Sequence, residues 1–208
     1  RVNVIVANPP FGGAVKDGVE KNFPAEFRTK ETADLFLVLF IHLLKPNGRC
    51  GIVLPDGSLF GEGVKTAIKK KLLEECNLHT IIRLPQGVFN PYAGVNTNLL
   101  FFEKGSPTKE VWFYELPLPE GLRQYTKGRP IQHEEFDPVR RWWSDRQSNG
   151  HAWKVSIKEI QERNYNLDFK NPKRQETVSH KAPKELLEGI DEKEKQISSI
   201  MNEIKNIL

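Results

Sequence analysis

Hydrophobic and polar positions alternate along the first half of the chain in blocks typical of strands and helices. Short runs rich in β-branched or aromatic residues predict strands, and the longer apolar or amphipathic runs between them predict helices. The predicted strands are Val2–Ala7, Arg49–Leu54, Leu78–Leu84, Asn98–Glu103 and Lys109–Leu116, and the predicted helices are Ala33–Leu44 and Gly63–Cys76. This alternation indicates an α/β fold with a doubly wound sheet, and the last strands, joined without helices, indicate an antiparallel edge.

The first strand and the first helix frame a long polar segment. Val2–Ala7 is rich in β-branched residues, which predicts a strand buried on both faces. The helix Ala33–Leu44 is apolar nearly all round and is followed by the turn-forming residues Lys45–Gly48. Gly12–Thr32, between the strand and the helix, is polar and contains glycine, so we expect a loop.

The periodic pattern is weaker in the second half of the chain. Before Lys184, the pattern there predicts only one short helix, at Ser156–Glu162, and it predicts one long helix over Lys184–Leu208. We therefore expect a sheet domain at 1–116, an irregular extension packed on it at 117–170, a linker at 171–183 and a C-terminal helix at 184–208.

Composition narrows the class of protein only slightly. A chain of 208 residues with 38% hydrophobic residues has room for one medium-sized core and an appendage. Its net charge of +4 and pI near 9.0 suit a nucleic-acid partner but are weak evidence for one. Cys50 and Cys76 lack the spacing of metal ligands, so we expect reduced core thiols, no metal site and a cytoplasmic protein. No apolar run is long enough to cross a membrane.

The strongest chemical signal is the motif Asn8-Pro9-Pro10-Phe11 at the end of the first strand. Ligands of open α/β sheets bind beyond the carboxyl ends of the strands. Asn8 precedes a proline, so its backbone is extended, and its amide oxygen is a hydrogen-bond acceptor. The fixed φ of Pro9 and Pro10 makes their carbonyls rigid acceptors, and Phe11 adds a flat apolar face.

Two fixed acceptors beside an aromatic ring suit a planar base that carries an exocyclic amine. Hydrogen bonds from both amine hydrogens would localise a lone pair that is otherwise delocalised into the ring. The nitrogen can then attack a strong electrophile such as a methyl sulfonium and lose its proton afterwards, so no strong base is needed. A base within a duplex must be flipped out to reach such a pocket. The alternative is a turn that only ends the strand.

The whole chain resembles the C-terminal half of the modification (methyltransferase) subunit of type I restriction-modification systems. The resemblance rests on the Asn8–Phe11 motif and on the segments LLKPNGRCGIVLPDGSLF (Leu43–Phe60) and LPQGVFNPYAGVNTNLLFFEK (Leu84–Lys104). These subunits are adenine-N6 DNA methyltransferases that use S-adenosylmethionine. The resemblance implies a Rossmann-like, S-adenosylmethionine-dependent methyltransferase fold, here the C-terminal half of its sheet, and methylation of a flipped adenine in double-stranded DNA.

The resemblance also implies roles for the motif residues. Asn8 and the Pro9 carbonyl hold the target amine, Phe11 stacks on the adenine, and Asn8 and Pro10 lie against the cofactor. In the family, a glycine-rich cofactor loop and an acidic residue that binds the ribose precede the motif, and neither occurs in this sequence. We therefore expect the chain alone to bind S-adenosylmethionine poorly and to be inactive without the rest of the subunit.

The C-terminal helix carries a heptad pattern. Its isoleucines recur at the spacing of a coiled-coil seam about three heptads long, at Ile190, Ile197 and Ile204, with Ile200 and Ile207 between them. The resemblance implies docking on the specificity subunit, in a complex that also contains the restriction subunit. The alternative is that the helix packs on its own domain. No recognition module is visible in the sequence, so we expect another subunit to choose the DNA site.

Two further groups of residues have both a functional and a structural interpretation. Phe89 or Tyr92, in a glycine-rich loop, could form a second wall for the flipped base, or this could be an ordinary packed loop. Arg140-Arg141-Trp142-Trp143, with Arg146 nearby, could bind phosphates and bases. We favour the other interpretation, in which the tryptophans anchor a loose segment and the arginines stay in solvent.

The remaining titratable residues give no separate catalytic centre. His42, His79, His133, His151 and His180 lack the spacing of metal ligands. His42 is predicted to be a core residue of its apolar helix, and Asp34 to be a carboxylate that favours the first turn of that helix.

Two rival functions remain open at this point. The chain could act chiefly as an assembly module without activity of its own. It could also belong to an enzyme that methylates RNA guanine or protein glutamine, since Asn-Pro-Pro-aromatic motifs occur in those methyltransferases too.

Overall fold

The structure is a computed structural model that describes residues 1–173, 193–197 and 200–201. The chain divides into two units, Arg1–Arg174 and Gln175–Leu208. All strands and helices named below belong to the first unit. None of the described helices combines the length and the apolar character that a membrane span requires.

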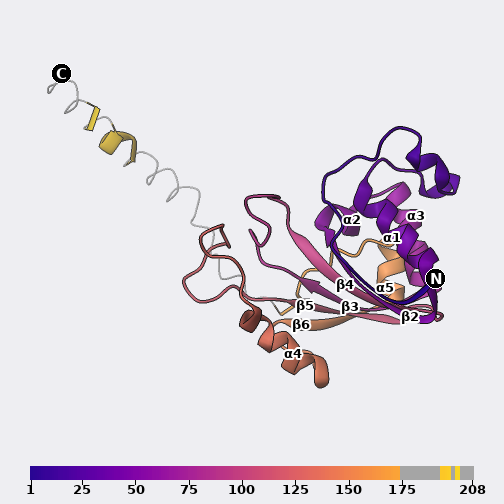
Figure 1. Ribbon diagram of the computed structural model, residues 1–208. Helices are drawn as coiled ribbons and strands as arrows, with labels where there is room; N and C mark the ends of the chain where they lie inside the picture. The colour runs from indigo at the N-terminus through magenta and orange to yellow at the C-terminus, as the bar shows by residue number, and fades with distance from the viewer. Residues whose placement is uncertain (174–192, 198–199, 202–208) are drawn as a thin grey trace. The chain divides into compact units, whose positions relative to one another are not determined.

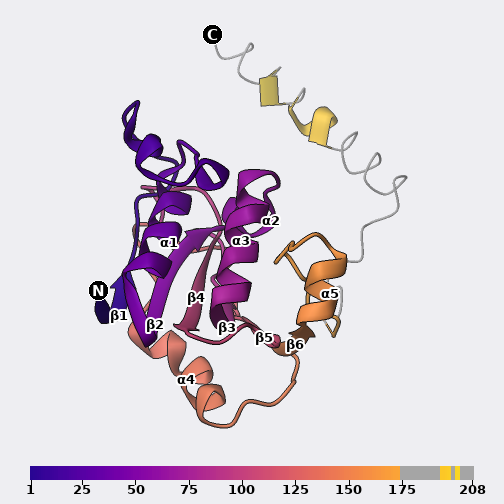
Figure 2. The ribbon, with the colours of Figure 1, turned by 90° about the vertical axis from the view of Figure 1, so that its right-hand side faces the viewer.

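Six strands form one mixed sheet in the order β1-β2-β4-β3-β5-β6, which Figure 2 shows from one side of the sheet to the other. The strands are β1 (Val2–Ala7), β2 (Leu44–Pro55), β3 (Cys76–Arg83), β4 (Thr97–Lys104), β5 (Glu110–Glu115) and β6 (Ala152–Ser156). The pairs β1–β2 and β3–β5 are parallel, whereas β4 is antiparallel to both of its neighbours and β6 is antiparallel to β5.

Helices cover the two faces of the sheet unequally (Figure 1). One face carries α1 (Thr32–Leu43), α2 (Asp56–Phe60), α3 (Val64–Glu75) and α5 (Ile157–Glu162), and the opposite face carries α4 (Asp137–Ser144). Short 3-10 helices occur at η1 (Val19–Asn22), η2 (Ala25–Phe27) and η3 (His133–Phe136).

A separate apolar core lies on each face of the sheet. The larger core, beneath α1, α3 and α5, includes Ile41, Leu72, Phe102, Phe113 and Ile160, all fully buried. The smaller core, beneath α4, includes Ile82, Tyr114, Val139 and Trp142. The larger core explains why the apolar runs of α1 and α3 are helical: each must turn a wide apolar stripe toward the sheet.

The α/β fold with a mixed sheet is confirmed, but β1 is not buried on both faces. Val2, Val4 and Val6 are 44%, 55% and 86% exposed. The reason is position: β1 is an outer strand of the sheet that pairs with β2, and none of the described helices covers its valine side. β-Branched composition predicted a strand correctly but could not reveal its neighbours.

The antiparallel strands also differ from the expectation of an antiparallel edge. β6 does form such an edge, but β4 lies in the interior between β2 and β3. Leu100 and Phe102 of β4 are almost completely buried against the larger core, which favours an interior strand. β5 lies parallel to β3 on the far side of β3 from β4.

Local structure in the second half is richer than the sequence pattern predicted. Residues 117–170, expected to be irregular, contain η3, α4, β6 and α5, of which only α5 was predicted. Within the predicted C-terminal helix, residues 193–197 and 200–201 are helical, and the remainder lies outside the described residues.

Candidate active site

The carboxyl ends of β1, β2 and β3 and the start of β4 meet at one edge of the sheet. Ala7 at the end of β1 pairs with Ile52, and Arg83 at the end of β3 pairs with Asn98 near the start of β4. The Asn8–Phe11 motif therefore leaves the sheet beside the last residues of β2. This edge is where open α/β sheets bind their ligands.

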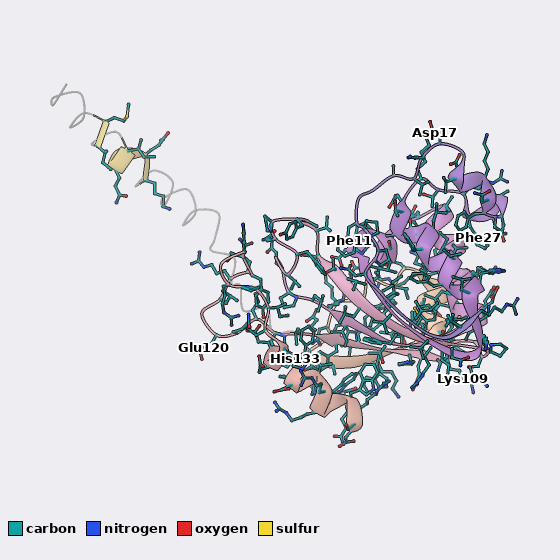
Figure 3. All side chains as sticks on the ribbon, viewed as in Figure 1. Phe11, Asp17, Phe27, Lys109, Glu120 and His133 are labelled. Carbon is teal, nitrogen blue, oxygen red and sulfur yellow. The ribbon has the colours of Figure 1, made fainter. Side chains whose placement is uncertain are left out.

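The motif forms an open corner beyond β1. Pro9 is buried, and Asn8 and Pro10 are exposed. Phe11, labelled in Figure 3, is half-buried. The chain just after the motif is fixed to the start of α1, because the carbonyl of Gly13 accepts hydrogen bonds from the Thr32 backbone N–H (3.0 Å) and from Thr32 Oγ1 (2.7 Å). The corner is thus accessible to a ligand and held by α1.

Phe89 meets the motif from the loop between β3 and β4. The ring centroids of Phe11 and Phe89 are 5.0 Å apart with the planes at 83°, a T-shaped pair. Tyr92 is 92% exposed, so the structure brings Phe89 to the motif and leaves Tyr92 in solvent. The prediction that Phe89 lies at the same edge as the motif is confirmed.

An oriented carboxylate at the same edge was not singled out in the sequence. Asp56 follows β2 directly, and its Oδ1 accepts a hydrogen bond of 2.6 Å from the amide of Asn98, which is completely buried. The other amide atom of Asn98, Oδ1, is buried without a hydrogen-bond partner among the described residues. In the sequence, Asp56 stands in a Pro-Asp-Gly turn, and only the register of β2 and β4 places it beside Asn98.

A buried ionic cluster joins the helices behind this edge. Asp34, in the first turn of α1, is 2% exposed and accepts hydrogen bonds from Ser58 Oγ (2.7 Å) and Lys65 Nζ (2.5 Å). Burial alone would lower the pKa of Lys65, but its hydrogen bonds to Asp34 and Glu31 outweigh that effect and raise it. Asp34 is a first-turn carboxylate as predicted, and its partners were visible only after folding.

A second lysine of α3, Lys69, binds the carbonyl groups at the end of α2. Lys69 of α3 is 2% exposed and donates hydrogen bonds of 2.8 Å to the carbonyls of Leu59 and Gly61. Burial and the neighbouring charge of Lys65 lower its pKa to about 8. Lys69 directly, and Lys65 through Asp34 and Ser58, thus fix α2 and the turn that carries Asp56.

Comparison with known proteins identifies the family. The model of a family described as N-6 DNA methylase matches residues 1–181. The chain belongs to the N-6 DNA methylase family. The methylase subunit of the type I restriction enzyme EcoEI from Escherichia coli is 57% identical over 215 residues, an alignment that covers 100% of this chain and 44% of the relative.

Solved structures agree with this assignment. A chain from a structural study of type I restriction-modification assembly has a TM-score of 0.79 at 41% identity, covering 99% of this chain and 45% of that one. The type I methyltransferase subunit from Streptococcus thermophilus has a TM-score of 0.64 at 27% identity, covering 79% and 36%. The resemblance to type I modification subunits is confirmed, and the chain spans less than half the length of these relatives.

The arginine and tryptophan cluster of this chain is part of the packing beneath α4. Trp142 is 6% exposed and contacts Tyr114 and Trp112. Trp143 contacts Phe101 at a centroid distance of 4.9 Å. Arg140 and Arg141 are exposed, as expected, whereas Arg146 is half-buried with its guanidinium 4.3 Å from the ring centroid of Trp143. The anchoring interpretation of the tryptophans is confirmed, although they belong to a helix rather than to a loose segment.

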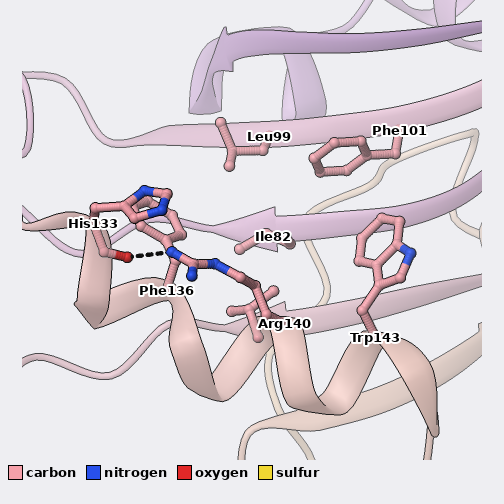
Figure 4. A pocket seen from close by; sticks show the side chains of 8 residues that line it. Ile82, Leu99, Phe101, His133, Phe136, Arg140 and Trp143 are labelled. Carbon is pink, nitrogen blue, oxygen red and sulfur yellow. Dashed lines mark hydrogen bonds between the residues drawn. The ribbon is translucent and has the colours of Figure 1, made fainter.

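A hollow of about 310 Å³ lies between α4 and the sheet (Figure 4). Its lining is mostly apolar and consists of Ile82, Leu99, Phe101, His133, Phe136, Val139, Arg140 and Trp143. Arg140 donates a hydrogen bond of 2.6 Å to the carbonyl of His133 at its rim. The lining offers few polar groups to orient a ligand, unlike the corner at Asn8.

The histidine and cysteine residues within 1–173 show no sign of a catalytic or metal-binding role. His42 is exposed, so the prediction of a core histidine is wrong: the apolar stripe of α1 does not extend around the whole helix. Cys50 and Cys76 are buried free thiols, as predicted. Among the described residues, no cluster of three or more His, Cys, Asp or Glu side chains could hold a metal ion.

Proposed function

We propose that this chain is the part of an adenine-N6 DNA methyltransferase that grips the target amine. Asn8 Oδ1 and the Pro9 carbonyl accept the two hydrogens of the N6 amine, and Phe11 stacks on the flipped base. The observation that carries the proposal is the open corner at the carboxyl edge of the sheet, in which Asn8 is exposed next to a half-buried Phe11.

The chemistry of this corner is positioning rather than proton abstraction. Two accepted hydrogen bonds direct the lone pair of the amine away from the ring system, toward the incoming methyl group. S-Adenosylmethionine supplies that methyl group as an electrophile. With the cofactor bound, the amine held by Asn8 and Pro9 would accept the methyl group from the sulfonium and release one proton to water.

Phe89 supplies the second wall of the base site in this proposal. Its T-shaped contact with Phe11, at 83° and 5.0 Å, supports a corner with two perpendicular aromatic sides, in which the base would stack on Phe11 with an edge against Phe89. Tyr92, 92% exposed, is the less suitable candidate for that wall. Stacking of a base on aromatic side chains is worth about 1–3 kcal/mol for each base, enough to offset part of the cost of flipping.

Replacement of Asn8 tests the proposal. In the complete methylase subunit assembled with its partners, we expect Asn8→Ala to lower methyl transfer to DNA by at least about a hundredfold, as loss of an electrostatic contact in the transition state does. Asn3→Ala is the matched control, because Asn3 is also exposed on β1 but lies away from the corner. Tritium transfer from labelled S-adenosylmethionine measures the rates, and wild-type activity in Asn8→Ala would contradict the proposal.

The same assay separates the substrate classes. DNA is the expected acceptor, and membership of the N-6 DNA methylase family supports this choice. Transfer to RNA or to protein glutamine would favour the other methyltransferase classes. Normal assembly of an Asn8→Ala complex that methylates as well as wild type would favour the assembly-module alternative.

We propose that most contacts to S-adenosylmethionine come from parts of the subunit outside this sequence. Asn8 and Pro10 are exposed at the corner and are suited to lie against the cofactor. The 44% coverage of the EcoEI relative and the exposed valines of β1 support a site completed by further residues. Calorimetry of this chain alone should detect no binding at micromolar cofactor, and clear binding would count against the proposal.

We propose that the C-terminal helix docks on the specificity subunit, in a complex that also includes the restriction subunit and double-stranded DNA. Ile197, Ile200 and Met201 are 61%, 56% and 50% exposed, which supports an apolar seam available to a partner helix. We expect Ile197→Asp with Ile200→Asp to abolish co-purification with the specificity subunit. The control, Lys195→Asp, places a carboxylate away from the seam and should leave the complex intact. If the Ile197→Asp, Ile200→Asp double variant still co-purified with the specificity subunit, docking through this seam would be refuted.

A further inference from the structure

The loop that carries Phe89 has a defined shape but limited anchorage of its own. The N–H of Asn90 donates to the carbonyl of Gly87 (3.0 Å), and the N–H of Tyr92 donates to the carbonyl of Phe89 (2.8 Å). Both bonds lie within the loop, so they shape it without tying it to another element. Packing of Val88 and Phe89 against the smaller core holds part of the loop, and hydrogen bonds to another segment fix its backbone.

The segment after β5 supplies this anchorage through the backbone of Tyr125. The Tyr125 N–H donates to the carbonyl of Gln86 (3.0 Å), and Asn90 Nδ2 donates to the carbonyl of Tyr125 (3.2 Å). These two bonds bracket Phe89. Gly87, with φ +84°, lies directly against the same backbone: a Cβ at this position would come within 2.2 Å of the Tyr125 carbonyl oxygen.

The Tyr125 side chain is itself rigidly held. It is completely buried, and its hydroxyl donates a hydrogen bond of 3.1 Å to Glu135 Oε2. Glu135 also accepts hydrogen bonds from the Gln132 N–H (2.6 Å) and from Arg129 (2.5 Å), whose guanidinium lies 5.9 Å from the Tyr125 ring centroid. Burial and Glu135 raise the pKa of Tyr125 to about 12, so the hydroxyl remains a donor at neutral pH.

We propose that residues 125–135, here called the Tyr125 clamp, hold Phe89 at right angles against Phe11 and thereby set the geometry of the aromatic corner for the flipped adenine. The inference rests on the proposed function, because it assigns a purpose to the Phe89 wall. Tyr125 is a positioning residue: its backbone holds the loop, and its buried side chain holds its backbone. The methyl-transfer chemistry itself remains at Asn8 and Pro9.

Two variants loosen the clamp without removing Phe89. Asn90→Ala deletes one hydrogen bond at a half-buried loop position, so we expect kcat/KM for DNA to fall about threefold to tenfold. Gly87→Ala forces Tyr125 and the loop apart at a left-handed φ, so we expect a fall of about tenfold to a hundredfold. The loss should appear as a raised KM for DNA, while the KM for S-adenosylmethionine stays within about twofold of wild type. Gln124→Ala, an exposed neighbour of Tyr125, is the control and should behave as wild type.

A double-variant cycle distinguishes positioning from a general loss of structure. If the clamp acts through Phe89, Asn90→Ala should cost little further activity in a Phe89→Ala background. Additive losses, or equal changes in both KM values, would overturn the inference. A strong effect of Phe89→Ala with none from Asn90→Ala or Gly87→Ala would overturn the clamp alone. A neutral Phe89→Ala would remove the second wall and the clamp together, and an active Asn8→Ala would remove the proposed function.

Discussion

Replacement of Lys65 by Met should strongly destabilise the fold. Lys65 Nζ lies 2.5 Å from Asp34 Oδ2, and the two side chains are 16% and 3% exposed. Met keeps the length and much of the apolar volume of the lysine stem but removes the charge. Asp34 would then be a buried carboxylate with the Ser58 hydroxyl as its remaining hydrogen-bond donor in the cluster.

The size of the effect follows from the geometry of the pair. Opposite unit charges 2.5 Å apart attract each other by about 6–7 kcal/mol at an effective dielectric constant of about 20. Desolvation of both groups offsets much of this attraction, but removal of one partner leaves the other buried and uncompensated, which typically costs about 3–5 kcal/mol. We expect Lys65→Met to lower the free energy of unfolding by about 3 kcal/mol, at the lower end of this range. The Lys65 side chain is 16% exposed, so solvent can reach the site and partly hydrate the unpaired Asp34 carboxylate.

Urea unfolding followed by tryptophan fluorescence measures this loss. Lys70→Met is the matched control: its partner Glu74 is 3.8 Å away, both side chains are more than half exposed, and the expected change is below about 0.5 kcal/mol. Adding Asp34→Leu to Lys65→Met removes the orphaned carboxylate and should restore part of the stability. A loss below about 1 kcal/mol for Lys65→Met, or a double variant less stable than the single one, would refute the reasoning.

Two further changes test the packing of β3. Burial, together with the charge of Arg146, lowers the pKa of His79 from 6.5 to about 4. The unfolded chain therefore binds this proton more readily than the folded chain, and the free energy of unfolding should fall as the pH drops from about 6.5 toward about 4. His79→Gln should flatten this pH dependence, which urea midpoints measured across the range would show. Thr108 Oγ1 donates to the carbonyl of Cys76 (2.7 Å) and accepts from the N–H of Leu78 (2.8 Å). Thr108→Val should leave both backbone groups buried and unpaired, at a cost of about 1–3 kcal/mol in the same unfolding assay, whereas Thr108→Ser should retain most of the stability.

Elements with a strong local pattern were predictable. Ala33–Leu44 and Gly63–Cys76 were placed to within one residue of α1 and α3, because a helix must turn a continuous apolar stripe toward the sheet. α4 was missed because it is short, and its Trp and Val side chains stand among arginines in a polar stretch. β6 was missed because it has only five residues and depends on β5 for its hydrogen bonds.

The candidate site was predictable where its chemistry is contiguous in sequence. Asn8, Pro9, Pro10 and Phe11 are adjacent, so the strand end and the fixed proline geometry indicated an amine-binding corner directly. Asp56 with Asn98, and Phe89 with Tyr125, are pairs distant in sequence. Their proximity depends on the register of β2 and β4 and on a loop that folds back across the sheet edge.

By itself, the sequence determined the α/β class, the positions of α1 and α3 and the rigid corner at Asn8–Phe11, because these follow from local periodicity and backbone stereochemistry. The tertiary structure decided which strands are neighbours, why the β1 valines remain exposed, which charges are paired behind the site, and how Phe89 is held against Phe11. Strand order and loop docking depend on contacts between residues far apart in the chain, and those contacts form only when the whole sheet assembles.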